Sequence, residues 1–128
     1  MNNKEIGTEF EKKVCDWLAE RGFWVHFIEP NKKGAQPFDI IAARDGFSFA
    51  FECKTLVDNR KYFPLSRLEE NQRLALNKWH QCGNWRSDIL IGWRGKIVIV
   101  PYDYLCRYGK ANLESGLFEE VIIDENNC

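Results

Sequence analysis

Three residues in two short segments of the chain could together hydrolyse a phosphodiester bond. They are Asp39 and, thirteen residues later, Glu52 and Lys54, which flank Cys53 in an E-x-K arrangement. Mg²⁺ in proteins is usually bound by one or two carboxylates together with water and substrate phosphate oxygens. A metal held there would polarise a phosphate and activate water, and a lysine could orient that water or offset charge on the phosphorus. These residue types therefore point to metal-dependent phosphodiester hydrolysis.

The surrounding residues predict a hairpin that would bring this group together. We expect strands at 38–44 and 47–54, because Asp45-Gly46 between them is a strong signal for a two-residue hairpin turn. Side chains alternate between the two faces of a strand. One face of the second strand holds Phe47, Phe49, Phe51 and Cys53, which we expect in the core, and the other holds Ser48, Ala50, Glu52 and Lys54. Glu52 and Lys54 then point the same way, and the partner strand can present Asp39 nearby.

Periodicity also predicts the elements around this hairpin. Apolar residues three and four apart predict a first helix over 6–22, ended by Gly22, and Ser66 suits the N-cap of a second helix through about Gln81. The apolar face of the second helix is expected to hold Leu68, Leu74, Ala75, Leu76 and Trp79. The other expected elements are strands at 23–29, 87–93, 96–100 and 118–123, loops at 31–34 and 55–64, and a helical turn at 102–108. This order predicts an α/β domain with a mixed central sheet flanked by helices.

Length and composition predict one domain spanning residues 1–128, since a chain of this size has room for one ordinary hydrophobic core. No stretch approaches the roughly 20 apolar residues of a membrane span, and the polar first residues lack a secretory pattern. We therefore expect a cytoplasmic protein of a bacterial or phage-infected cell, with no membrane partner. Five widely spaced cysteines without a C-x-x-C pair are expected to be reduced thiols. The formal net charge of -1 means that any DNA affinity must come from a local patch.

A simpler interpretation of the E-x-K sequence is an exposed ion pair worth 0 to about 1 kcal/mol on a small α/β interaction domain. That interpretation predicts no metal binding and no effect of Glu52→Ala beyond stability. The position of the motif favours a site instead, because it ends a hydrophobic strand after a hairpin whose partner strand opens with an Asp. His26 and His80 lack partners at metal-ligand spacing and are expected to be structural. None of the five tryptophans is assigned to DNA.

The motifs resemble those of the PD-(D/E)XK nuclease superfamily and, within it, of Holliday-junction resolvases of the RecU type. Pro37-Phe38-Asp39 is similar to the "PD" half with one residue inserted, and Glu52-Cys53-Lys54 to the E-x-K half. The αβββαβ order is that of the restriction-endonuclease-like core. Further similarity to resolvases lies in Gly7-Thr8-Glu9-Phe10-Glu11, Phe51-Glu52-Cys53-Lys54-Thr55, Phe63-Pro64-Leu65 with Gln72 seven residues later, and Tyr108-Gly109-Lys110. The resemblance covers residues 7 to about 113.

The resemblance implies roles for five residues. Asp39 and Glu52 would be metal ligands together with the backbone carbonyl of Cys53, Lys54 the catalytic lysine, Glu11 an acid on the first helix, and Gln72 a residue lining the site. Helical periodicity supports Glu11 over Glu9, because Glu11 borders the buried face whereas Glu9 lies on the polar side. The implied cofactor is Mg²⁺, with Mn²⁺ expected to substitute, and no small-molecule cofactor is expected.

The implied activity is endonucleolytic nicking of four-way or other branched DNA by a homodimer, because paired nicks in two strands call for two active sites related by a two-fold axis. RecU proteins carry a projecting stalk between early strands, whereas only Asn31 to Gln36 separates the first two strands here. A compact resolvase of phage or archaeal type fits this length. The alternatives are a repair or restriction-type nuclease without junction specificity and a non-catalytic module that recognises DNA structure.

Basic residues in loops and at the edges of elements are candidates for contacts to DNA phosphates. The 59–62 stretch, which follows Lys54 closely, is the first choice for a clamp on the DNA backbone. A loop that the charges merely keep solvated is the alternative. The candidates are Lys12, Lys32, Lys33, Arg60, Lys61, Arg67 and Arg73.

Overall fold

The computed structural model describes residues 2–29 and 36–123. Its helices are α1 (Asn3–Glu20), α2 (Glu70–Gln81) and α3 (Tyr102–Tyr108), with a single 3-10 turn at Leu65–Arg67. Its strands are β1 (Trp24–Phe27), β2 (Ile40–Arg44), β3 (Phe47–Thr55), β4 (Tyr62–Pro64), β5 (Arg86–Trp93), β6 (Lys96–Pro101), β7 (Lys110–Asn112) and β8 (Glu119–Ile122). Six strands form one sheet in the order β1-β2-β3-β5-β6-β8, and β4 pairs with β7 in a small second sheet.

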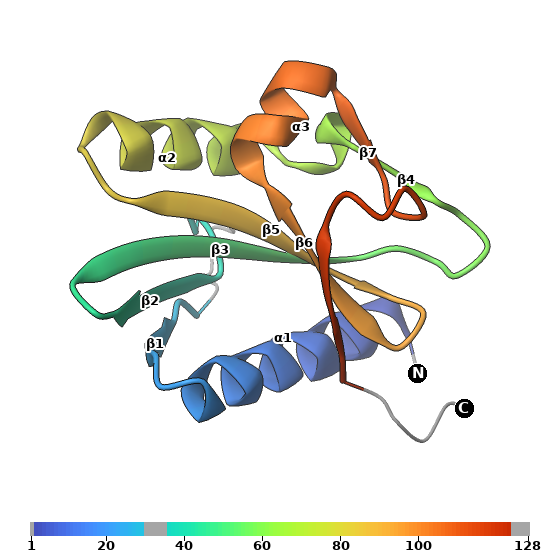
Figure 1. Ribbon diagram of the computed structural model, residues 1–128, viewed down its shortest axis with the longest axis horizontal. Helices are drawn as coiled ribbons and strands as arrows, with labels where there is room; N and C mark the ends of the chain where they lie inside the picture. Colours follow the sequence, from blue (N-terminus) through green and yellow to red (C-terminus); the bar gives the residue numbers. More distant parts are fainter. Residues whose placement is uncertain (1, 30–35, 124–128) are drawn as a thin grey trace.

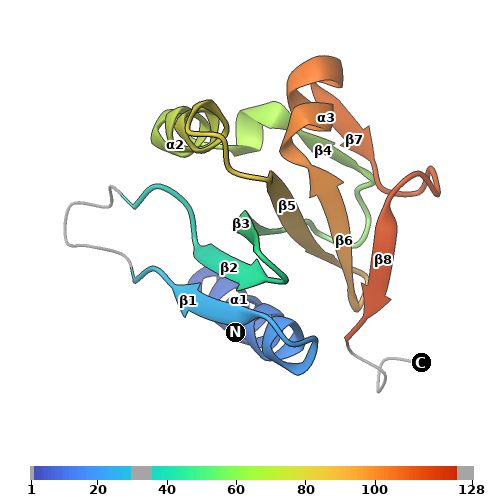
Figure 2. The same cartoon turned by 60° about the vertical axis from the view of Figure 1, so that its left-hand side comes forward.

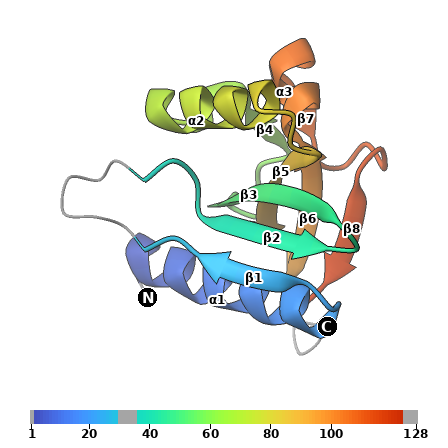
Figure 3. The ribbon, with the colours of Figure 1, turned by 90° about the vertical axis from the view of Figure 1, so that its left-hand side faces the viewer.

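The large sheet lies between α1 on one face and α2 with α3 on the other (Figure 1). Turned by 90°, the molecule shows β1 and β2 at the near edge of the sheet, with α1 below and α2 above (Figure 3). One apolar core lies between α1 and the sheet around Val14, Leu18 and Leu90. The other lies under α2 and α3 around Leu76, Ile91 and Leu105. The expected α/β class with a mixed sheet flanked by helices is confirmed, since β3 pairs antiparallel with β2 and parallel with β5.

The predicted hairpin forms as expected. Asp45 and Gly46 both adopt positive φ values, 55° and 82°, which suit the two central residues of a tight hairpin turn. Phe49, Phe51 and Cys53 pack into the core on the α1 side. The opposite face of β3 is buried as well, because α2 covers it, so Ala50 and Glu52 are fully enclosed.

The second helix begins later than predicted. Its N-cap is Glu69, not Ser66, and the residues before it form the 3-10 turn. Leu68 adopts an extended conformation (φ -86°, ψ 129°), which interrupts any helix that starts at Ser66. Leu74, placed on the apolar face by the sequence, is 61% exposed, whereas Leu76 is buried.

Two short strands, β4 and β7, form a pair that the sequence did not predict. β4 occupies the end of the predicted 55–64 loop and pairs with β7 through Phe63 and Ala111, both buried. Figure 2 shows this pair beside α3, away from β1. The first helix also begins earlier than predicted, because Asn2 accepts a hydrogen bond from the Glu5 amide and caps it. Gly22, with φ 86°, follows its last turn.

Candidate active site

Asp39 lies immediately before β2 and is held by two hydrogen bonds. Its Oδ2 accepts from the backbone N–H of Cys53 at 2.8 Å, so the carboxylate replaces a backbone partner just before β2 begins. Its Oδ1 accepts from Nε2 of Gln36 at 3.1 Å. The side chain is 4% exposed. Both oxygens are therefore fixed in direction before any ligand arrives.

Glu52 and Lys54 share a face of β3, as alternation predicted. Nζ of Lys54 lies 3.4 Å from Oε2 of Glu52. The same oxygen accepts a hydrogen bond from Nε2 of Gln72 on α2. Glu52 is 1% exposed, and its Oε1 is buried without a hydrogen-bond partner among the described residues. A buried acceptor of this kind costs free energy unless another group satisfies it.

Gln72 is oriented by the first turn of its own helix. It forms a capping box with Glu69, in which each side chain bonds to the backbone N–H of the other residue. Oε1 of Gln72 accepts from the Glu69 amide at 3.0 Å, which directs the NH₂ end toward Glu52. The cap of α2 therefore sets the orientation of a side chain in the site.

Asn71 supports the other carboxylate. Its Nδ2 donates to the backbone carbonyl of Gln36 at 2.9 Å, and Gln36 in turn donates to Asp39. Neither Asn71 nor Gln36 carries a sequence signal that marks it as part of the site. They are 35 residues apart, and hydrophobic periodicity carries no signal for a polar contact over that distance. The first turn of α2 thus reaches both carboxylates, one directly and one through Gln36.

Glu11 faces the same group from α1. Burial and the charge of Asp39 together raise the pKa of Glu11 to about 7, against the opposing effect of Lys54. Glu9, the alternative acid, lines a different hollow beside the β5–β6 turn. The helix can approach the sheet closely because a Cβ at Gly92 would lie 2.8 Å from the ring of Phe10, the neighbour of Glu11.

The site is strongly acidic and desolvated. Burial and the nearby Asp39 carboxylate together raise the pKa of Glu52 to about 9, against the opposing effect of Lys54. Two carboxylates in one dry pocket repel each other when both are ionised. A cation between them would remove that repulsion.

The residues present fit a divalent cation. Among the described residues, no cluster of three or more His, Cys, Asp or Glu side chains is arranged to hold a metal. Two carboxylates and one backbone carbonyl nevertheless suffice for Mg²⁺, which keeps several waters and takes substrate oxygens as further ligands. The unpartnered Oε1 of Glu52 is the kind of acceptor that such an ion would satisfy.

Cys53 offers its backbone to the site and its side chain to the core. Its thiol packs against the α1 side, and burial raises its pKa well above the usual value, so it stays protonated. The carbonyl lies on the same side of the strand as the N–H that binds Asp39, as in any extended ladder. In the described residues Cys15, Cys53, Cys82 and Cys106 are free thiols, as expected.

The predicted DNA-contact residues fall in different places. Lys12 lies on α1 and lines a shallow hollow with Glu11. Arg67 ends the 3-10 turn, and its guanidinium donates to the carbonyl of Thr55, the residue after Lys54, at 3.0 Å. Arg73 is exposed on α2, next to Gln72. Lys32 and Lys33 lie outside the described residues.

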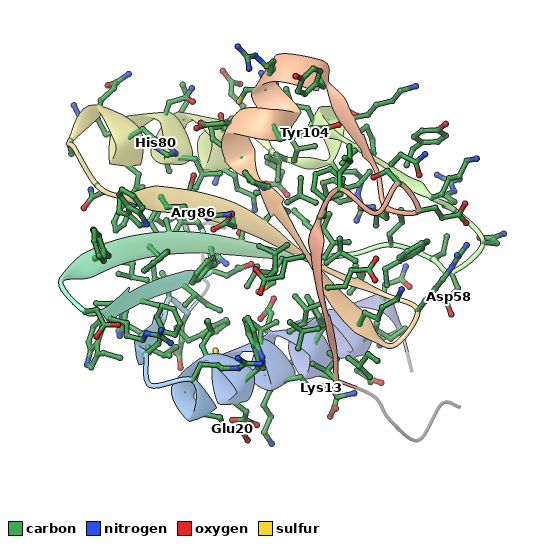
Figure 4. The ribbon with its side chains drawn as sticks, in the orientation of Figure 1. Lys13, Glu20, Asp58, His80, Arg86 and Tyr104 are labelled. Carbon is green, nitrogen blue, oxygen red and sulfur yellow. The ribbon has the colours of Figure 1, made fainter. Side chains whose placement is uncertain are left out.

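Arg60 and Lys61 lie on the loop that follows β3. This loop is anchored to the β5–β6 hairpin, because the Arg94 amide donates to Oδ1 of Asp58 at 3.0 Å and Nε1 of Trp93 donates to the Arg60 carbonyl at 2.7 Å. Asp58 marks the loop at the edge of the molecule, beyond the end of β3 (Figure 4). These anchoring contacts do not connect the loop to Asp39 or Glu52.

A mixed sheet between helices, with an Asp and an E-x-K brought together at the end of its hairpin, defines a restriction-endonuclease-like nuclease fold. The family model described as "Archaeal holliday junction resolvase (hjc)" matches residues 2–114. The chain belongs to this family and is a junction-resolving nuclease that acts on DNA junctions. The expectation of a Holliday-junction resolvase is confirmed, with the archaeal family as the one matched, and the nucleases of this family are metal-dependent.

Among solved structures, the chain is similar to Hjc of Archaeoglobus fulgidus, described as a Holliday junction resolvase from an archaeal hyperthermophile. The TM-score is 0.62 at 21% sequence identity, over 94% of this chain and 90% of that one. This similarity supports the fold. No curated protein sequence matches the chain. Within residues 2–29 and 36–123, no helix has the length and apolarity needed to cross a bilayer.

Proposed function

We propose that Asp39, Glu52 and the Cys53 carbonyl hold Mg²⁺, for which Mn²⁺ can substitute, and that a junction strand is hydrolysed there. The observation that carries this proposal is the buried Oε1 of Glu52, which has no partner among the described residues, on a side chain whose pKa is raised by the nearby Asp39 carboxylate. When bound, the ion would polarise the scissile phosphate and lower the pKa of a coordinated water. The remaining tasks fall to side chains of the protein.

Lys54 is the catalytic lysine in this proposal. Its ammonium lies beside Glu52 and within the field of Glu11, and its side chain is 17% exposed. From that position it can orient a water or stabilise charge that develops on the phosphate. Gln72 keeps Oε2 of Glu52 occupied and leaves Oε1 for the metal. Glu11 completes the acidic wall on the α1 side.

The unit that acts on a junction is proposed to be a homodimer of single-domain protomers, each spanning residues 1–128. A four-way junction is resolved by nicks in two strands, and a two-fold axis supplies one active site for each. We propose Lys12 on α1, Arg67 on the 3-10 turn and Arg73 on α2 as phosphate contacts, together with Lys32, Lys33, Arg60 and Lys61. A closer likeness to RecU and a phage origin stay predictions from the sequence.

The test is a cleavage assay on a labelled four-way junction, a flap, a splayed arm and a linear duplex, each with Mg²⁺ or EDTA. Wild type is expected to nick the junction symmetrically with Mg²⁺ and to leave all substrates intact in EDTA. Asp39→Asn and Lys54→Ala should bind the junction without cutting it. Cleavage of every substrate at equal rates would support a nuclease without junction specificity. Binding with no cleavage of any substrate by wild type would replace the enzyme with a recognition module.

A further inference from the structure

Two aromatic side chains stack on the outer face of the edge strand β1. The rings of Trp24 and His26 have centroids 6.0 Å apart and an interplanar angle of 11°. Trp24 is 62% exposed and His26 is also exposed. Val25 and Phe27, which alternate with the pair along β1, point to the other face and pack against the core on the α1 side. The stacked pair is therefore held at the surface by a strand whose other face is anchored.

Strand register places this pair on the same face of the sheet as the nuclease carboxylates. Trp24 is opposite Ala43 on β2, and His26 is opposite Ile41. Ile41 packs into the core on the α2 side, whereas its neighbour Ile40 packs on the α1 side. Alternation along β3 puts Glu52, two residues after Ala50 of the α2-side core, on the same side as the pair. Asp39, just before β2, is linked to α2 through Gln36 and Asn71.

The same spacing sets how far the rings lie from the metal site. A strand rises about 3.3 Å per residue, so His26 lies about 7 Å and Trp24 about 13 Å along the sheet from Asp39. Duplex DNA rises about 3.4 Å per base pair, so this distance corresponds to about two to four base steps. In Figure 3, β1 and β2 lie side by side between α1 and α2.

We propose that the Trp24–His26 pair stacks on an unpaired base of the DNA junction within a few nucleotides of the scissile phosphate. This inference rests on the proposed placement of the active site at Asp39 and Glu52. The Trp24–His26 pair and the carboxylates lie on the same face of the sheet. DNA bound at the carboxylates therefore extends toward the pair, so DNA is the ligand that we assign to it. An exposed π-face accepts any base, and stacking on aromatic side chains is the common device of proteins that bind single strands. The pair thus distinguishes a branch point, where bases are available, from an intact duplex.

The chain offers a matched control. Trp85 is 59% exposed and also lies against an aromatic ring, that of Phe47, at 4.8 Å between centroids. Trp85 lies in the turn before β5. Its partner Phe47 lies on the same face of β3 as Phe49 and Phe51, which is the α1 side and not the side of the Trp24–His26 pair. Trp85→Ala removes a similarly exposed tryptophan and leaves the Trp24–His26 pair intact.

The experiment measures dissociation constants of Trp24→Ala, Trp24→Phe, Trp85→Ala and wild type for a four-way junction and a linear duplex, in EDTA and over a range of salt. Trp24→Ala is expected to weaken junction binding about 5- to 100-fold, in line with the loss of one stacked base. Trp24→Phe should recover most of that loss, and Trp85→Ala should match wild type. Duplex binding should not change. The salt dependence of Trp24→Ala should equal that of wild type, because stacking releases no counterions.

Equal junction affinity of Trp24→Ala and wild type would overturn the stacking role while leaving the nuclease assignment intact. A reduced salt dependence would also overturn it, because the lost contact would then involve phosphates. A change in the sedimentation coefficient of the free Trp24→Ala protein would assign the pair to an interface between protein copies. If wild type bound no junction at all, both this inference and the proposed function would fail. Circular dichroism melting, expected to be unchanged for an exposed residue, checks that each variant is folded.

Discussion

Gln72 uses the two ends of one amide group to join the start of α2 to Glu52. Its Oε1 accepts the Glu69 backbone N–H at 3.0 Å, while its Nε2 donates to Oε2 of Glu52. The cap that begins a helix and the carboxylate that is proposed to bind metal are therefore parts of one hydrogen-bonded unit. Asn71, the preceding residue, extends the unit to Asp39 through Gln36.

Substitutions at Glu69 and Gln72 should have similar effects on the free energy of unfolding but different effects on cleavage. Glu69→Ala and Gln72→Ala each remove one side of the capping box, and each should destabilise the protein by about 0.5–2 kcal/mol. Gln72→Ala alone also leaves Glu52 without its donor, so its affinity for Mg²⁺ or its cleavage rate should fall about 10- to 100-fold. Urea denaturation and junction-nicking rates measure the two effects. Equal nicking by both variants would show that Gln72 serves only the helix.

The stability of the metal-free protein should fall as the pH rises. Burial and Asp39 raise the pKa of Glu52 to about 9 from its ordinary value of 4.5. The folded state therefore binds this proton more tightly than the unfolded state. The stabilisation is complete below pH 4.5 and is lost as the pH increases through about 9. Glu11, with a pKa raised to about 7, acts in the same direction.

Replacing Glu52 with glutamine should remove most of that loss, because an amide has no proton to release. In EDTA, Glu52→Gln is expected to match wild type near pH 4.5 and to exceed its stability at pH 8 by something on the order of a few kcal/mol. Denaturant titration at the two pH values measures the difference. A constant difference across this range would mean that Glu52 is already ionised in the folded protein.

Asn71 should act on Asp39 without touching it. Asn71→Ala releases the Gln36 carbonyl and loosens the donor that holds Oδ1 of Asp39. Outer contacts to metal ligands typically contribute 10- to 100-fold to metal affinity, so a reduction of about tenfold is expected in a calorimetric titration with Mg²⁺ or Mn²⁺. The matched control is Asn77→Ala, on the same helix, where the lost partner is the Tyr102 hydroxyl. An equal effect of both variants would place the cause in helix stability.

Arg67 should contribute one phosphate contact. Its guanidinium donates a hydrogen bond to the carbonyl of Thr55, the residue after Lys54. Arg67→Ala is expected to weaken binding to junction and duplex alike and to reduce the slope of log affinity against log salt by about 0.9. Arg107→Ala, on α3, serves as the control for loss of charge. A slope equal to that of wild type would remove Arg67 from the DNA interface.

The hairpin and its chemistry were predictable from local sequence. The contacts that support it were not, although the family resemblance implied Gln72 as a residue lining the site. Asp45-Gly46 fixed the turn, and alternation placed Glu52 and Lys54 together on the face opposite Phe51. Those signals depend on neighbours in the chain. The contacts of Asn71 with Gln36 and of Gln72 with Glu52 span 35 and 20 residues, and only the packing of α2 over the sheet creates them.

The errors have the same origin. Ser66 is a good capping residue by type, but the reciprocal bonds of Glu69 and Gln72 start the helix three residues later. The strands β4 and β7 are three residues each, too short to show alternation, and they become strands only by pairing with each other. The sequence assigned none of the tryptophans to a surface role, although Trp24 and Trp85 are 62% and 59% exposed.

The central claim is that Asp39 and Glu52 together hold the metal, and Mn²⁺ binding followed by electron paramagnetic resonance tests it most directly. Wild type at pH 8 should bind Mn²⁺, and Glu52→Gln and Asp39→Asn should each bind it at least about tenfold more weakly, because each loses a charged oxygen ligand. Mn²⁺ affinities of both variants equal to that of wild type would contradict the account.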